Sequence, residues 1–117
     1  MPCDSTPSTN LDRLIDHLRD LPLERFDMSE WCGTACCIAG HAYELGIIQV
    51  NPSGLNNYYE MGAPFGMDVI QASEAFALPG RSIDMLRIIP ISAAVSMLEH
   101  FRDTGIVDWA RIIGARP

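Results

Sequence analysis

Lysine is absent from this chain of 117 residues: all eight basic residues are arginines, and 15 acidic residues outnumber them to give a net charge of −7. No basic residue lies between Arg25 and Arg81, an interval with six acidic residues: Asp27, Glu30, Glu44, Glu60, Asp68 and Glu74. Because nucleic-acid affinity rests on lysine and arginine, this composition argues against direct nucleic-acid binding through the middle of the chain. It favours a protein partner with a basic surface, since opposite fields steer the encounter.

Long apolar runs are missing too. No stretch approaches the roughly 20 residues that span a bilayer, and the first eight residues have neither the basic start nor the apolar middle of a signal peptide. We therefore expect a cytoplasmic protein without membrane association, in which the four cysteines stay reduced. The length predicts one domain: a disordered leader over residues 1–9, then a single helical domain over residues 10–115.

Apolar residues at helical spacing dominate the chain. The clearest stripe predicts a first helix that is capped by one of residues 8–10 and stopped by Pro22; its members are Leu11, Leu14, Ile15, Leu18 and Leu21. Further helices are expected over residues 34–45, 67–78 and 90–105, short helices over 82–89 and 108–113, and a long loop over 51–66. The fold class is therefore mainly α: a compact single-domain bundle of four main helices plus short helices, with at most a small β element.

Three of the four cysteines and one of the three histidines lie in the twelve residues from Trp31 to Ala42. If Thr34 caps the second helix, Cys36 and Cys37 fall in its first turn, where the helix dipole lowers a thiol pKa. A metal site is the other chemical interpretation: Cys37 and His41 are four residues apart and can chelate zinc together with Cys32. A fourth ligand would then come from His17, His100 or a carboxylate.

Close packing explains more of this segment. Its cysteines are separated by three and four residues, which is not the redox motif with two intervening residues. Small residues surround them, and a glycine inside a helix costs roughly 1 kcal/mol relative to alanine, so a close neighbour is expected at Gly40. The small residues are Gly33, Ala35, Ala39, Gly40 and Ala42. We therefore expect no cofactor and no catalytic residue, with a zinc or thiol site at Cys32, Cys37 and His41 as the alternative.

The segment without basic residues coincides with the aromatic loop over residues 51–66. A partner-binding surface is predicted there, formed by Glu44, Tyr58, Tyr59, Glu60, Asp68 and Glu74. A weaker alternative is a helix–turn–helix regulator over residues 70–89, broken at Pro79 and Gly80. Its second helix offers Arg81 and Arg87 but also Asp84.

Three segments resemble a family of small uncharacterised bacterial and phage proteins. They are Arg25-Phe26-Asp27-Met28, the run with the pattern W-C-G-T-x-x-C-I-A-G-H-A over residues 31–42, and Asp103-Thr104-Gly105-Ile106-Val107-Asp108-Trp109. The resemblance covers most of residues 11–113 and implies a prokaryotic or phage origin and a compact helical domain, without an activity. By analogy with small acidic phage proteins, we expect a non-enzymatic protein that binds a host protein with a basic surface and inhibits it, host defence complexes included.

Overall fold

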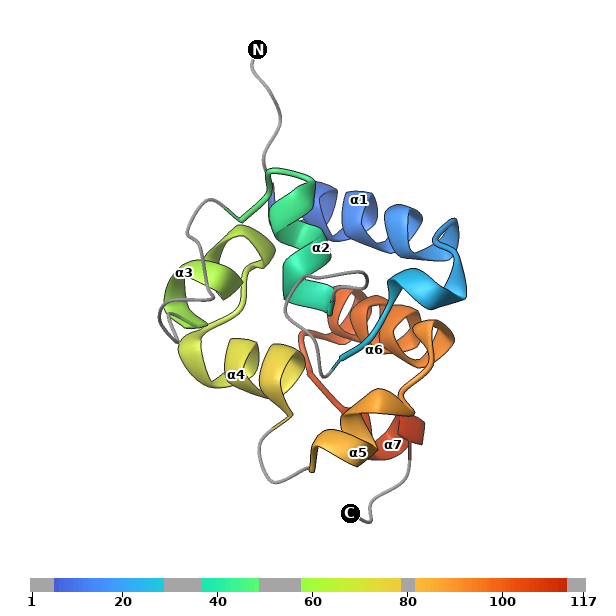
Figure 1. The fold of residues 1–117 in the computed structure, drawn as a ribbon. Helices are drawn as coiled ribbons and strands as arrows, with labels where there is room; N and C mark the ends of the chain where they lie inside the picture. Colours follow the sequence, from blue (N-terminus) through green and yellow to red (C-terminus); the bar gives the residue numbers. More distant parts are fainter. Residues whose placement is uncertain (1–5, 29–36, 49–57, 79–81, 114–117) are drawn as a thin grey trace.

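The two longest helices, α1 (Pro7–Arg19) and α6 (Ile91–Thr104), pack against each other and organise the fold (Figure 1). The computed structural model describes residues 6–28, 37–48, 58–78 and 82–113. The predicted apolar stripe of α1 is buried from Leu11 to Leu18, and α6 contributes Ala94, Leu98 and Phe101 to the same core. Ion pairs at the rim join the two helices, Arg19 with Glu99 and Arg102 with Asp12.

Helix α1 begins earlier than predicted. Its N-cap is Thr6, whose hydroxyl oxygen accepts a hydrogen bond from the Thr9 amide, and Pro7 is the first helical residue. Proline suits this position because its φ angle is already helical and the amide it lacks would have had no helical partner. The predicted caps at residues 8–10 and the leader over residues 1–9 are therefore corrected: residues 7–9 belong to the helix.

Five further α-helices and two 3₁₀ helices complete the described fold. The α-helices are α2 (Ile38–Glu44), α3 (Tyr58–Gly62), α4 (Val69–Ala77), α5 (Ile83–Arg87) and α7 (Trp109–Ile113), and the 3₁₀ helices are η1 (Leu23–Arg25) and η2 (Ala63–Phe65). The described part of the chain has no β-strand, only a single bridge residue at Phe26. With a radius of gyration of 13.1 Å, the mainly α single globule that the sequence predicts is confirmed.

The end of the predicted loop over 51–66 is instead helical, formed by α3 and η2. Met61 and Phe65 are buried there, and a Cβ atom added at Gly62 would lie 2.6 Å from the Cβ of Ala72 on α4. The absent side chain therefore lets α3 pack closely on α4. The buried Asn10 side chain also donates to the Pro64 carbonyl, at 2.7 Å, and holds η2 against α1. These contacts are tertiary, so the local composition does not reveal them.

No described helix is both long and apolar enough to cross a membrane, as the sequence predicts.

Candidate functional site: a histidine centre between α1 and α2

His41 is the most deeply buried polar side chain described, with none of its surface exposed. It lies on α2, and its Nε2 atom is 2.9 Å from the backbone carbonyl oxygen of Arg25. A carbonyl oxygen only accepts hydrogen bonds, so Nε2 carries a proton and donates it. The opposite ring nitrogen, Nδ1, is thereby left to face the other members of the site.

Two ligand-type atoms surround His41 Nδ1. Oε1 of Glu44, one helical turn later, is 2.9 Å away, and Nε2 of His17 on α1 is 3.2 Å away. The two imidazole rings are tilted by 52°, with their centroids 5.0 Å apart. We call His17, His41 and Glu44 the histidine centre.

Two neighbours outside the ligand set hold the histidine centre in place. The Phe26 ring stacks on His41 with an interplanar angle of 12° and a centroid distance of 6.3 Å. The Arg25 guanidinium lies 3.4 Å from Oε2 of Glu44, so one carboxylate joins the arginine to His41. Arg25 and Phe26 belong to one of the three segments on which the predicted resemblance rests and His41 to another, so two of these segments meet in space at this histidine.

Burial lowers the pKa of His17 below its usual value of 6.5, and the neighbouring His41 lowers it further. Glu44 acts in the opposite direction but is the smaller influence. His17 is therefore more readily neutral than a solvated histidine, and a neutral imidazole is the form that binds a metal ion. The His17 side chain is half-buried and turned toward α2.

The structure changes the role of Cys37. This residue is the N-cap of α2, not a member of its first turn, because the helix begins at Ile38 rather than near Thr34. Burial raises the pKa of its thiol and outweighs the opposing effect of the backbone amides of Gly40 and Ala39. The predicted activated thiolate is therefore wrong for Cys37. Among the described residues it also lies outside the group that gathers ligand atoms, while Cys32 and Cys36 lie beyond that part of the chain.

The predicted packing role of the segment holds for its described residues, since Ala39, Gly40, His41 and Ala42 are all buried. Among the described residues, the side chains that can hold a metal ion gather around His41 and do not include Cys37. His17 reaches this group from α1 and the Arg25 carbonyl from η1, both far from His41 in the sequence.

The residues predicted to bind a partner divide between two places. Glu44 belongs to the histidine centre. Glu60, Asp68 and Glu74 are exposed on α3 and α4, with Tyr59 exposed and Tyr58 half-buried on α3. Asp68 also has a structural role, because its Oδ1 accepts the Gln71 amide at 2.7 Å in the capping box of α4.

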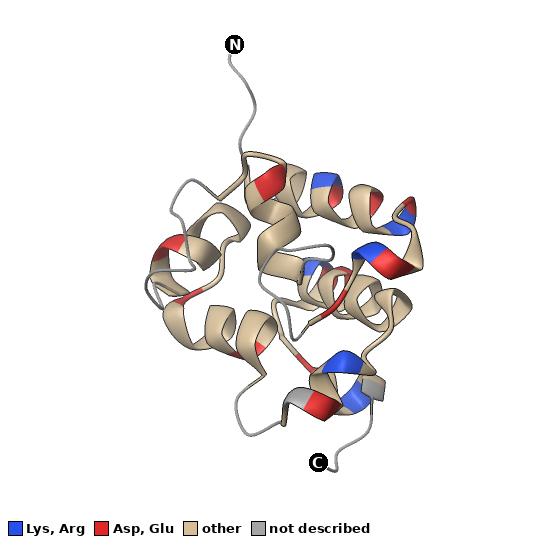
Figure 2. Cartoon of the chain, viewed as in Figure 1, with Lys and Arg blue, Asp and Glu red and all other residues tan. Residues whose placement is uncertain are grey.

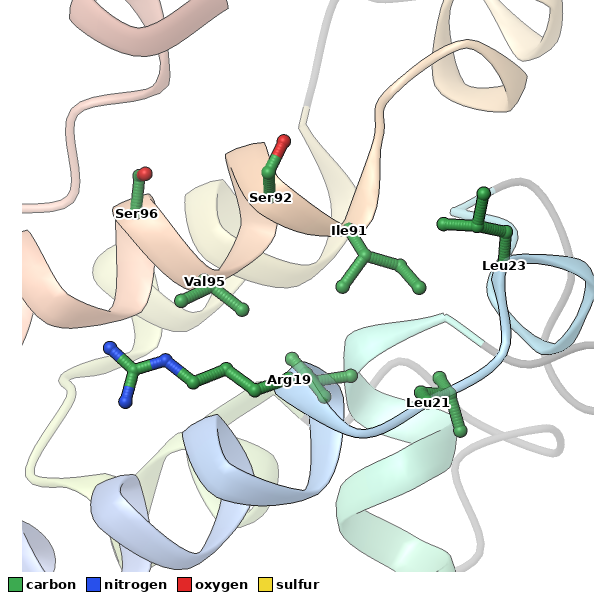
Figure 3. A pocket seen from close by; sticks show the side chains of 8 residues that line it. Arg19, Leu21, Leu23, Ile91, Ser92, Val95 and Ser96 are labelled. Carbon is green, nitrogen blue, oxygen red and sulfur yellow. The ribbon is translucent and has the colours of Figure 1, made fainter.

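A groove of about 420 Å³ lies between the end of α1 and the start of α6. Figure 3 shows Ile91 and Val95 projecting from α6 toward the side of the groove that carries Arg19 and Leu21. Its lining residues are Leu18, Arg19, Leu21, Leu23, Ile91, Ser92, Val95 and Ser96. Arg19 is the only charged residue among them and is paired with Glu99, so the groove offers no acid–base pair for catalysis.

Comparison with known proteins found no matching protein-family model, no matching curated protein and no matching solved structure. The resemblance of its motifs to phage and bacterial proteins stays a prediction.

Proposed function

We propose that this chain is a non-enzymatic binding domain whose α3–α4 face, residues 58–78, recognises a basic surface of another protein. This face contains three acidic residues, Glu60, Asp68 and Glu74, and no basic one. Figure 2 shows α3 and α4 carrying acidic positions alone, whereas blue and red positions both occur on α1, α5 and α6. A surface of one sign speeds and orients the encounter with a partner of the opposite sign.

The charge of the α3–α4 face contrasts with that of the other described elements. On α1, α2, α5 and α6, arginines pair with acids, as in Arg25 with Glu44, Arg87 with Asp84 and Arg102 with Asp103. Asp68 and Glu74 take part in no ion pair with another described residue. Their charge is therefore available to a partner.

Exposed apolar side chains on the same two helices support the proposal. Tyr59 is 66% exposed on α3, and Val69 and Ile70 are 50% and 67% exposed in the first turn of α4. Large apolar residues within a polar rim are typical of protein–protein contact surfaces, and tyrosine is enriched in them. Charge would orient the partner while these side chains supply the buried area.

The proposed partner is a protein of the cell that carries the phage or mobile element, and host defence complexes belong to this class. The motif resemblance, rather than the fold, supports this part of the proposal. The DNA-binding alternative has weaker support, because Arg87 on α5 is already paired with Asp84 at 3.7 Å, and Arg81 lies outside the described residues.

The test is capture from a bacterial lysate on the immobilised chain, followed by purification of the captured protein and a binding titration. Substituting Glu60→Lys and Glu74→Lys together should weaken the purified pair by at least about tenfold, the scale of close charge pairs across an interface. The wild-type affinity should fall as salt rises, since exposed charges are screened beyond a Debye length of about 10 Å at 0.1 M. Asp68→Asn removes a third charge and retains an N-cap residue.

A matched control reverses two exposed acids elsewhere, Asp16→Lys on α1 and Asp84→Lys on α5, which changes the net charge equally. This control should bind the partner nearly as well as the wild type. If both double variants weaken binding equally, the overall charge of the chain, not the α3–α4 face, recognises the partner. If the Glu60 and Glu74 variant binds as well as the wild type, the α3–α4 face is not the binding surface.

A further inference from the structure

We propose that the histidine centre binds one divalent transition-metal ion, Zn²⁺, through Nε2 of His17, Nδ1 of His41 and a carboxylate oxygen of Glu44. These atoms all lie within 4.8 Å of one another. The inference is independent of the proposed function, because the centre shares no residue with the α3–α4 face.

The spacing of the three ligand atoms suits a zinc ion. With zinc–nitrogen bonds of about 2.0 Å, the ligand atoms of a tetrahedral site are about 3.3 Å apart. Nδ1 of His41 lies 3.2 Å from Nε2 of His17 and 2.9 Å from Oε1 of Glu44. These two pairs are therefore near the spacing of a zinc site, and rotation of the exposed Glu44 side chain can bring its carboxylate closer to His17, which now lies within 4.8 Å of it.

The hydrogen bonding of His41 favours a cation at the same point. Because Nε2 donates to the Arg25 carbonyl, Nδ1 is the ring nitrogen that faces a carboxylate oxygen only 2.9 Å away, and without a proton of its own it is an acceptor. Two acceptors at this distance repel each other unless a proton or a metal ion lies between them. A metal ion satisfies His17, His41 and Glu44 at once, whereas a proton on Nδ1 satisfies only one of the contacts.

The groups around the ligands are those that metal sites use in their outer shell. A ligating histidine almost always donates its other ring N–H to a carbonyl or carboxylate, as His41 does to Arg25, and a ligating carboxylate is itself hydrogen-bonded. The Arg25 guanidinium faces Oε2 of Glu44 and leaves Oε1 directed at the centre. Arg25 thus positions two ligands, one through its backbone and one through its side chain.

The donor types select the class of metal. Two imidazoles and one carboxylate suit zinc and its neighbours, while calcium and magnesium prefer all-oxygen sites and copper(I) prefers sulfur. Three protein ligands leave a fourth position for water or another external ligand. His41 is buried, His17 half-buried and Glu44 exposed, so this graded exposure gives the ion a path from solvent.

The experiment is calorimetric titration of the full, EDTA-treated chain with Zn²⁺, with Co²⁺ as a spectroscopic probe. We expect one ion per chain and visible cobalt bands of tetrahedral or five-coordinate intensity. His17→Gln and Glu44→Gln should each weaken zinc binding by more than about 100-fold, the upper end of the effect of losing an outer-shell partner. His100→Gln and Cys37→Ala are the controls and should bind as the wild type does.

A nitrogen NMR measurement on the wild type keeps the test independent of variant folding. On zinc addition, the Nδ1 resonance of His41 and the Nε2 resonance of His17 should shift, while Nε2 of His41 stays protonated. Zinc binding that survives His17→Gln, or that disappears with Cys37→Ala alone, would overturn the proposal and favour a cysteine site. The absence of stoichiometric binding by the wild type would overturn it as well.

Discussion

Glu44 of the histidine centre and the acids of the α3–α4 face all lie in the segment without basic residues between Arg25 and Arg81, yet they differ in what surrounds their charges. In the centre, His17 and Arg25 come from α1 and η1 to meet Glu44 and His41, so opposite groups lie within 3.4 Å of one another. On the face, neither α3 nor α4 supplies a basic residue, and its acids are exposed. In the histidine centre, the chain itself supplies the groups that pair with the acid. The α3–α4 face instead has the properties of a surface for a partner.

This difference shows the limit of counting charges along a chain. Glu44 was grouped with the acids of the partner surface because no basic residue follows Arg25 until Arg81. The fold returns Arg25 to Glu44 across 19 positions, so this acid is compensated. Long-range pairing therefore decides whether an acid stabilises the fold or remains for recognition, and substitutions in the two regions should differ in what they affect.

His41→Ala should give the largest effect, a loss of about 3 kcal/mol in the free energy of unfolding. The substitution leaves a cavity beside Phe26 and removes the donor to the Arg25 carbonyl. Urea denaturation in EDTA measures it, with the half-buried His100→Ala as the control that should cost less. A His41→Ala protein within 0.5 kcal/mol of the wild type, an ordinary surface effect, would show that the centre does not stabilise the fold.

Gly62→Ala should cost about 2 kcal/mol, because the new methyl group would lie 2.6 Å from the Cβ of Ala72 and 3.0 Å from that of Met67. A double-mutant cycle with Ala72→Gly sharpens the test. Ala72→Gly costs about 1 kcal/mol by itself through helix propensity, but it makes room for the methyl group. The double variant should therefore be more stable than the sum of the single effects predicts, and additive losses would place the strain elsewhere.

Asp68→Ala should cost about 1 kcal/mol, the usual value of an N-cap, while Asp68→Asn should cost a few tenths. Both substitutions remove the same charge, so their difference isolates the hydrogen bond to the Gln71 amide. Thermal unfolding of the two variants measures this difference. Equal stability of the two would assign the effect of Asp68 to its charge instead of its cap.

Much of the helical framework could be predicted from local patterns, because its causes are local. The stripe of α1 is buried as predicted, and α5 lies within the short helix predicted over residues 82–89. The start of α1 was also readable, since Thr6 precedes a proline that fits the first helical position. Local hydrogen bonds and dihedral preferences act over a few residues, which is why such signals succeed.

The sequence offers His41 as a metal ligand and His17 or a carboxylate as a further one, but it does not single out the histidine centre, because packing joins its members. His17 and His41 are 24 positions apart, and the spacing of His17 within α1 gives no sign of the α2 neighbour. One signal was available: His41 and Glu44 are one helical turn apart, which brings a histidine and a carboxylate together. The three nearby cysteines favour a sulfur site by their number alone, so the pattern does not single out that pair.

The buried thiol of Cys37 predicts a smaller effect at alkaline pH. Burial raises the pKa of this thiol in the native chain, so the unfolded chain loses the proton first and stability falls as pH rises above the ordinary thiol pKa. Cys37→Ala should flatten this fall between pH 8 and 10, by a fraction of a kcal/mol. Thiol counting should agree: the variant loses one reactive thiol when denatured but none when native, and loss of a native reactive thiol would contradict the burial of Cys37.

Glu74→Gln and Glu60→Gln should change the free energy of unfolding least, by no more than about 0.5 kcal/mol, the usual range for exposed positions. Both side chains are exposed on a segment with three negative charges and no positive one, so removing a charge relieves repulsion as readily as it removes a favourable contact. Chemical denaturation at low salt measures the change. A loss as large as that of Asp68→Ala would make these acids part of the fold, and the distinction between the arginine-paired acid of the centre and the exposed acids of the face would fail.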